Sequence, residues 1–255
     1  MHVETLLAPV FGANCYLLSA DGSGPCVIVD AGGGVADDVH ATVVRRGLAP
    51  VAVLATHGHL DHTWSAAELG TRYGVPLWIH ADDAYRLADP FGSLDGSTGG
   101  ASGPLAQALA AAGFGPDQHV VPTDVSTFTA GQALTLGGLT VRAVHAPGHT
   151  QGATLFVVDE AVAPDSVLPG PQGPLPLAAR PGVAEGTVAV ALTGDVLFAG
   201  TIGRTDLPGG DMPQMTRTLT DVVSTLDPRT LVLPGHGPAT RLDVELRTNP
   251  YLARR

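Results

Sequence analysis

Residues 56–62 read Thr-His-Gly-His-Leu-Asp-His and hold four side chains that can bind a metal ion. They follow an apolar stretch, 51–55, that is typical of a strand buried on both faces, so they form a strand-to-helix turn. Imidazole nitrogens and carboxylate oxygens are ligands for zinc, iron or manganese, and Gly58 favours a tight bend between the first two histidines. We predict that the turn directs its ligands toward two points, not one. The four candidate ligands are His57, His59, Asp61 and His62.

Three later segments show the same pattern, in which an expected strand ends and a turn presents a histidine or an aspartate. Open α/β sheets place their binding sites at strand ends, so these side chains are candidates for the same site. Seven ligands are about the number that two metal ions need when a water and a shared carboxylate complete their shells. The later candidates are His149 after the strand 141–144, Asp195 after 188–192 and His236 after 231–233.

The elements that position these residues alternate between strand and helix in the first third of the chain and are mostly strands afterwards. This order favours a layered α/β structure, and 255 residues with 44% hydrophobic content suffice for a complete core. We predict a strand at 119–121. His80 and His145 are interpreted as structural histidines, with hydrogen-bond donation to the metal ligands as the alternative. Residues 160–186 contain six prolines without a helical or strand period, so we expect a mobile Pro/Gly-rich insertion.

The composition excludes several classes of partner. Thirteen Lys and Arg against 24 Asp and Glu give a net charge of −11, which disfavours nucleic acids and anionic membranes. The sequence has no uncharged apolar run of roughly 18 residues, as a membrane-spanning helix would need. Its first residues do not resemble a signal peptide, and Cys15 and Cys26 lack CxxC spacing. We therefore predict a cytoplasmic protein with two reduced core cysteines.

The sequence resembles the metallo-β-lactamase superfamily, whose HxHxDH signature is matched by the 57–62 cluster, with His149, Asp195 and His236 in the superfamily's order. The similarity covers nearly the whole chain. Residues 203–211, Gly-Arg-Thr-Asp-Leu-Pro-Gly-Gly-Asp, are similar to a segment of short bacterial type II glyoxalases and their persulfide dioxygenase relatives. The resemblance implies a single domain, 1–255, with the four-layer αββα sandwich of this superfamily and a metal site between the edges of its two sheets.

The resemblance also assigns roles to the candidate residues. It implies two divalent ions, with zinc favoured and iron or manganese as alternatives. Asp61 and Asp195 are expected to be catalytic as well as ligands, because a bridged water needs a residue that orients it or carries its proton. Arg204 and Asp206 either support the site or form an ordinary surface ion pair. By the same resemblance, His57, His59 and His149 hold the first ion, Asp61, His62 and His236 hold the second, and Asp195 bridges them.

The function implied by the resemblance is a metal-dependent, glyoxalase II-like hydrolase that cleaves small-molecule thioesters, S-lactoyl thiols foremost. A hydroxide bridged by two ions attacks the carbonyl without a serine or cysteine nucleophile, and the chain has no GxSxG motif. One alternative is a mononuclear iron persulfide dioxygenase using His59, His149 and Asp195, which form a two-histidine, one-carboxylate set. A lactonase of the same superfamily is another. A metal-free scaffold protein would be expected to lack ligands, and all seven are present.

Overall fold

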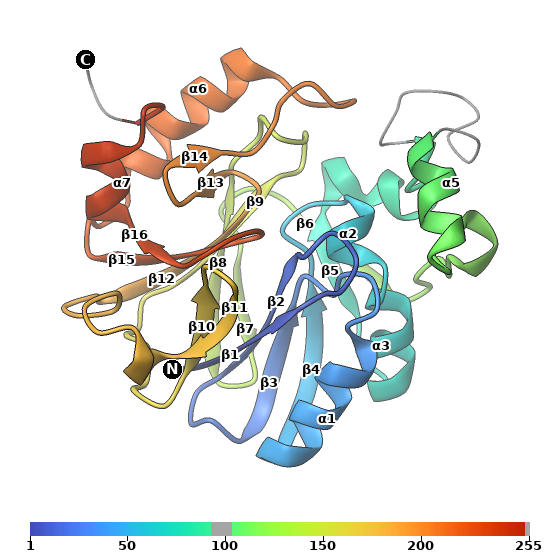
Figure 1. The fold of residues 1–255 in the computed structure, drawn as a ribbon, viewed down its shortest axis with the longest axis horizontal. Coiled ribbons are helices and arrows are strands. Elements are labelled where there is room, and N and C mark those ends of the chain that lie inside the picture. The colour runs from blue at the N-terminus through green and yellow to red at the C-terminus, as the bar shows by residue number, and fades with distance from the viewer. Residues whose placement is uncertain (93–103, 253–255) are drawn as a thin grey trace.

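The computed structural model describes residues 1–92 and 104–252, and its centre is a pair of six-stranded β-sheets (Figure 1). In the first sheet the strands follow the order β1-β2-β3-β4-β5-β6, with parallel pairing from β3 to β6 and antiparallel pairing of β1, β2 and β3. The parallel strands all end at the same edge, which is where a site is expected. The strands are β1 (His2–Leu7), β2 (Asn14–Ser19), β3 (Gly24–Val29), β4 (Leu48–Leu54), β5 (Leu77–His80) and β6 (Val125–Phe128).

The second sheet follows the order β16-β15-β12-β9-β8-β7 and is antiparallel except where β12 pairs with β15. A short hairpin of β13 (Leu197–Phe198) and β14 (Thr201–Ile202) follows β12. The strands of the second sheet are β7 (Ala133–Leu136), β8 (Leu139–His145), β9 (Thr154–Val158), β12 (Ala189–Gly194), β15 (Thr230–Pro234) and β16 (Thr240–Arg241).

Helices cover the outer face of each sheet, which confirms the predicted αββα sandwich. Helices α1 and α3 lie on the first sheet, and α6 and α7 lie on the second (Figure 1). The α helices are α1 (Ala36–Arg46), α2 (Leu60–Thr63), α3 (Ala66–Tyr73), α5 (Pro104–Ala111), α6 (Met212–Asp221) and α7 (Leu242–Thr248). The 3₁₀ helices are η1 (Ala81–Leu87), η3 (Pro116–Gln118), η4 (Leu177–Ala179) and η5 (Val223–Thr225).

Three hydrophobic clusters join the layers, because alternate residues of each strand point to opposite faces. In β2, Tyr16 and Leu18 face the cluster between the sheets, whereas Cys15 and Leu17 face the helices α1 and α3. Cys15 and Cys26 are buried free thiols, and both belong to the cluster between the first sheet and the helices α1 and α3. This location confirms their predicted place in the core.

The strand predicted at 119–121 is wrong. Val120 and Val121 are 64% and 45% exposed, and they lie outside any strand, between η3 and β6. The sheet edge is instead completed by β6, which pairs in parallel with β5. Two adjacent valines favour a strand locally, but a strand also needs a partner and a buried face.

Residues 160–186 contain a second hairpin, formed by β10 (Val167–Gly170) and β11 (Gly173–Pro176). The hairpin packs beside β1, where Thr5 Oγ1 donates a hydrogen bond to the Val167 carbonyl, and Leu168 is buried in the cluster between the sheets. This segment therefore closes one end of the sandwich. Its mobility stays a prediction.

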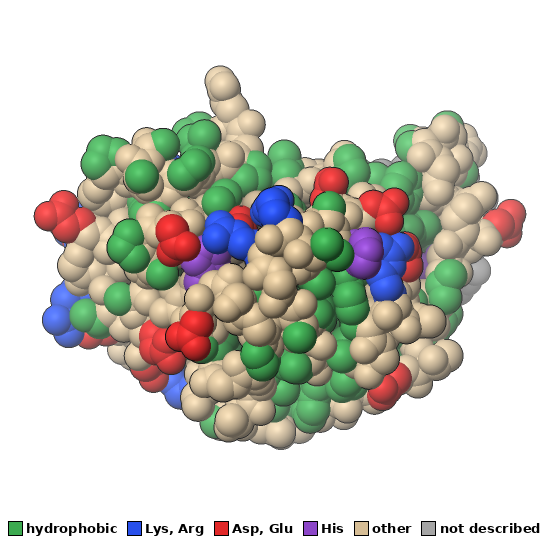
Figure 2. Space-filling model, turned by 90° about the horizontal axis from the view of Figure 1, so that it is seen from below, with side chains coloured by type: hydrophobic (Ala, Val, Ile, Leu, Met, Phe, Trp, Pro, Cys, Tyr) green, Lys and Arg blue, Asp and Glu red, His purple; other side chains and the backbone are tan. Residues whose placement is uncertain are grey.

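Among the described residues, no helix combines the length and apolar character that crossing a membrane requires. On the lower face of the molecule, acidic and basic side chains are interspersed (Figure 2). This face shows no concentrated basic patch of the kind that binds nucleic acids.

Candidate metal centre

Five of the seven candidate ligands lie in loops that follow four strands, and Asp61 and His62 lie in the short helix α2. His57 and His59 lie between β4 and α2, and His149 lies between β8 and β9. Asp195 follows β12, and His236 follows β15. The first strand belongs to one sheet and the other three belong to the second, so the site joins the two halves of the sandwich. All seven side chains predicted from the sequence converge there, in overlapping groups that could each hold an ion.

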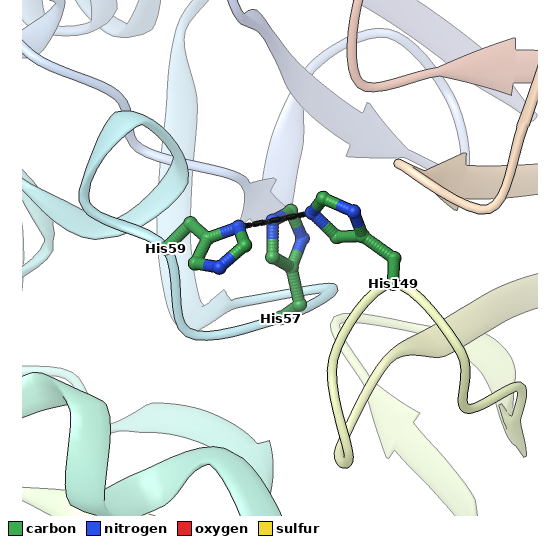
Figure 3. A group of neighbouring side chains, drawn as sticks. All are labelled: His57, His59 and His149. Atoms are coloured by element: carbon green, nitrogen blue, oxygen red, sulfur yellow. Dashed lines mark hydrogen bonds between the residues drawn. The ribbon is translucent and has the colours of Figure 1, made fainter. Parts of the chain in front are cut away.

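The first group consists of His57, His59 and His149, whose side chains point to one spot (Figure 3). The His149 Nε2 atom lies 3.2 Å from His57 Nε2 and 2.9 Å from His59 Nδ1, and these two lie 3.1 Å apart. Nitrogens at the corners of a tetrahedron with Zn–N bonds of about 2.0–2.1 Å would be roughly 3.3 Å apart. The three nitrogens are thus spaced as the ligands of one tetrahedral ion are.

The second group contains Asp61, His62 and His236. The Asp61 Oδ2 atom lies 3.2 Å from His236 Nε2 and 3.6 Å from His62 Nε2. The second group is less enclosed than the first, because the His236 side chain is 29% exposed and the Asp61 side chain is 18% exposed. A ligand or water at this end of the site can therefore be reached from solvent.

Asp195 lies between the two groups. Its Oδ2 atom is 3.7 Å from His149 Nε2 in the first group and 3.7 Å from His236 Nε2 in the second. Its Oδ1 atom is 3.4 Å from His62 Nε2. This is the location expected of a carboxylate shared by two ions, as the sequence comparison with the superfamily implied.

Hydrogen bonds fix which nitrogen of His57, His62 and His149 faces the centre. His149 Nδ1–H donates to the Arg204 carbonyl at 2.7 Å, which leaves its Nε2 lone pair free to bind an ion. Thr56 Oγ1 donates to Asp30 and so accepts from His57 Nδ1–H at 3.2 Å, with the same consequence for His57. His62 Nδ1–H donates to Asp30 Oδ2 at 3.0 Å. The ring nitrogens that face the centre are therefore oriented to bind a cation before one is present.

The electrostatics of the two groups differ. Burial, with His149 contributing, lowers the pKa of His59 to about 2, and burial lowers the pKa of His57 well below its usual value. The first group therefore offers neutral imidazoles, the form that binds metal ions. Near His62 burial would also lower the pKa, but the carboxylates of Asp61 and Asp195, with Asp30, raise it to about 10. Three carboxylates around one imidazole form a site that attracts positive charge.

Several buried polar atoms at the centre lack a hydrogen-bond partner among the described residues. They include His62 Nε2 and Asp195 Oδ1, which face each other across the second group. A buried polar atom without a partner is costly, and a bound cation would supply the missing partner to both. The residues present therefore fit a divalent metal.

Asp30 is a site residue that the sequence analysis missed. It follows β3 with a φ of 57°, is 1% exposed, and accepts hydrogen bonds from the Thr56 backbone N–H, from Thr56 Oγ1 and from His62. The available signal was its place at the end of an apolar strand, before Ala-Gly-Gly-Gly, which is the same pattern that identified Asp195.

Arg204 contacts the centre through its backbone carbonyl, which accepts the hydrogen bond from His149. Its guanidinium forms two hydrogen bonds with Asp206, at 2.7 and 2.8 Å, and both side chains are more than 60% exposed. The side chains of Arg204 and Asp206 therefore form a surface ion pair, and only the Arg204 backbone carbonyl contacts a candidate ligand. His80 and His145 stack 4.2 Å apart and, with Asp82, form a separate cluster outside the centre.

A cavity of about 310 Å³ opens beside the candidate metal ligands. Phe11, Leu60 and Leu207 supply apolar walls, and Arg204 lies at its margin. The ligands that face the cavity are His59, Asp61, His149, Asp195 and His236. A small molecule in this cavity would therefore lie against the centre.

Comparison with known proteins decides the family. The family model described as the metallo-beta-lactamase superfamily matches residues 8–163. The chain belongs to this superfamily. Most of its members are metal-dependent hydrolases that bind divalent ions, so the metallo-hydrolase interpretation of the centre is supported at this level.

Relatives match this metallo-β-lactamase superfamily chain over nearly its whole length. An uncharacterized protein of Mycobacterium tuberculosis is 36% identical over 99% of this chain and 98% of its own. The probable metallo-hydrolase YqgX of Bacillus subtilis is 31% identical, covering 94% and 92%. The hydroxyacylglutathione hydrolase GloC of Haemophilus influenzae is 29% identical, covering 99% and 98%.

Solved structures agree with the sandwich fold. BLEG-1, a B3 metallo-beta-lactamase, superposes with a TM-score of 0.72 at 26% identity, covering 99% of this chain and 100% of its own. TTHA1623, solved in a di-iron-bound form, gives a TM-score of 0.68 at 27% identity, covering 97% and 99%. Similar chains thus include a metallo-beta-lactamase and a hydroxyacylglutathione hydrolase, so the comparisons support the metallo-hydrolase class and no single substrate.

Proposed function

We propose that this protein is a glyoxalase II-like thioesterase that uses two divalent ions to hydrolyse S-acyl thiols such as S-lactoyl thiols. The observation that carries the proposal is the position of Asp195, whose carboxylate lies between the two ligand groups beside an open cavity. The similarity to a hydroxyacylglutathione hydrolase over nearly the full length of both chains supports the thioester class.

In this proposal His57, His59 and His149 hold the first ion, and Asp61, His62 and His236 hold the second, with Asp195 shared. Zinc is favoured by the nitrogen and oxygen donors, and iron or manganese suit the same set. When bound, such ions lower the pKa of a water toward about 7 and polarise a carbonyl oxygen.

The chain's own residues contribute orientation and proton transfer. Asp61 is partly exposed at the cavity. Burial alone would raise the pKa of the Asp61 carboxyl, but His62 and His236 outweigh that effect and hold the pKa below its usual range. Asp61 is therefore a carboxylate at neutral pH and can orient a water that approaches the centre by accepting its hydrogen bond. Phe11 and Leu207 form apolar walls that contact an acyl or thiol chain and exclude bulk water from the carbonyl.

A substrate panel tests the proposal. Metal-loaded protein is assayed with S-lactoyl and other S-acyl thiols, a lactone and a β-lactam, and the chelated protein serves as the control. We expect the thioesters to be hydrolysed with the highest kcat/KM and only in the metal-loaded sample. Preference for the lactone or the β-lactam would reassign the substrate class.

A second candidate, persulfide oxygenation by one iron, is favoured by the position of His149 Nε2, which lies 2.9 Å from His59 Nδ1 and 3.7 Å from Asp195 Oδ2. Two histidines and one carboxylate are the ligand set of non-haem iron oxygenases. Oxygen uptake by the iron-loaded protein with a persulfide separates this candidate from the thioesterase. Oxygen consumption without thioester hydrolysis would favour the dioxygenase.

A further inference from the structure

A fully buried ion pair lies beneath the first ligand group. Asp83 and Arg86 belong to η1, directly after β5, and both side chains are 0% exposed. Arg86 Nε lies 3.2 Å from Asp83 Oδ1. Taking two charges out of water is costly unless hydrogen bonds satisfy both groups, so a pair at this position requires an explanation.

The carboxylate of Asp83 accepts hydrogen bonds from both loops that carry the three histidines. Its Oδ2 atom accepts from the Gly58 backbone N–H at 2.9 Å and from Thr150 Oγ1 at 2.7 Å. Its Oδ1 atom accepts from the Gly152 backbone N–H at 2.9 Å. Gly58 lies between His57 and His59, and Thr150 follows His149, so one carboxylate joins ligand loops that extend from different sheets.

Arg86 extends the same connection to a third loop. One of its terminal nitrogens, Nη2, donates to Gln151 Oε1 at 2.9 Å and to the Pro208 carbonyl at 2.8 Å. Pro208 lies four residues beyond Arg204, whose carbonyl orients His149. The ion pair therefore contacts each of the segments that place the first ligand group.

The loops lie so close to this pair that only glycine fits at two positions. A Cβ atom on Gly58 would be 2.8 Å from Arg86 Cδ, and one on Gly152 would be 2.7 Å from Asp83 Cβ. Gly58 has no positive φ, so close approach, and not the tight bend expected from the sequence, explains why glycine is present. Contact this tight transmits the position of Asp83 directly to the histidine loops.

We infer that Asp83 is a positioning residue that sets the spacing of the three histidine nitrogens before a metal ion binds. The inference rests on the proposed metal-dependent function and adds a residue outside the ligand set. Groups that hydrogen-bond around a metal site typically change its affinity 10- to 100-fold when they are lost. In Asp83→Asn the side chain keeps its volume, but an amide nitrogen, which only donates, replaces one carboxylate oxygen. It then faces either the donors of Gly152 and Arg86 or those of Gly58 and Thr150.

The test measures metal binding, not turnover. Metal-free wild type, Asp83→Asn and a matched control are titrated with Co²⁺ in competition with a chromophoric chelator, and thermal melts show that each sample is folded. The control is Glu4→Gln, because Glu4 is a buried carboxylate paired with Arg46 and lies in β1, away from both loops. We expect two ions in wild type and in the control. Asp83→Asn should bind one of the two about 10- to 100-fold more weakly.

A milder variant, Thr150→Val, removes one hydrogen bond to Asp83 and leaves the ion pair intact. It should weaken the same ion by a smaller factor, and it decides the question if Asp83→Asn does not fold. Folded Asp83→Asn with wild-type affinity for both ions would overturn the inference, as would an equal loss in Glu4→Gln. If Asp83→Asn does not fold, wild-type affinity in Thr150→Val would overturn it. Wild type that binds no ion would instead overturn the proposed function on which the inference rests.

Discussion

His62 donates a hydrogen bond from Nδ1 to Asp30 Oδ2 across 3.0 Å, and neither side chain is more than 1% exposed. The bond fixes the ring so that Nε2 faces Asp61 and Asp195. Asp30→Asn should therefore weaken binding of the second ion by about 10- to 100-fold. Asn tolerates the left-handed backbone at this position, so the fold should persist.

Chelator competition with the metal-free protein measures this loss. Asp206→Asn is the control, because Asp206 is an exposed carboxylate that contacts Arg204 and none of the ligand side chains. Equal affinities in Asp30→Asn and wild type would show that His62 does not need Asp30 to present its nitrogen.

His59→Ala and Asp195→Ala should each abolish hydrolysis of S-acyl thiols. His59 supplies one of three converging nitrogens, and Asp195 is the carboxylate between both groups, so neither loss has a substitute nearby. Circular dichroism should show that the sandwich remains. Turnover close to that of wild type in either variant would refute the assignment of these residues to the centre.

Phe11 has a φ of 61° and is 47% exposed at the margin of the cavity. A bulky residue held in this conformation costs roughly 1–2 kcal/mol, which suggests a functional reason for it. Phe11→Ala should raise KM roughly fivefold, equivalent to about 1 kcal/mol of lost apolar contact, with kcat largely retained. Steady-state kinetics with a long-chain and a short-chain thioester provide the comparison. An unchanged KM for both would exclude Phe11 from substrate binding.

Removing the metal should destabilise the fold, because the centre leaves buried polar atoms unpartnered and places carboxylates near one another. A ligand present at 100 times its dissociation constant adds about 2.7 kcal/mol to the free energy of unfolding. For a chain of this size, that corresponds to a rise of about 5–10 °C in Tm. Calorimetry with and without chelator measures it, and an identical Tm would contradict metal binding in the folded state.

The sequence predicted the ligand set because five of the seven residues lie in loops that follow strands. The other two, Asp61 and His62, lie in the short helix α2 and belong to the same local cluster as His57 and His59. Asp30 and Asp83 escaped prediction for a physical reason. Each has a side-chain carboxylate whose hydrogen-bond partners lie 25 or more residues away, with the exception of Arg86. Local patterns report periodicity and turns, whereas such contacts exist only after segments distant in the sequence have packed together.

The fold, like the site, has features that local sequence patterns predict and others that depend on tertiary contacts. The apolar stretch at 51–55 was predictable because a strand buried on both faces is continuously hydrophobic, and β4 ends there. The pairing of β6 with β5 was not predictable, because Val125–Phe128 has a weaker local pattern than the exposed Val120 and Val121. Tertiary contacts decide which segment forms the edge strand of a sheet, and the local strand propensity of a segment does not report those contacts.

The most direct test of the central claim measures metal content and thioester hydrolysis on the same freshly purified sample. We expect about two divalent ions per chain and hydrolysis of an S-lactoyl thiol that is lost on chelation and restored by adding the ion back. Undiminished hydrolysis by a metal-free sample, or a fully loaded sample that hydrolyses no S-acyl thiol, would contradict it.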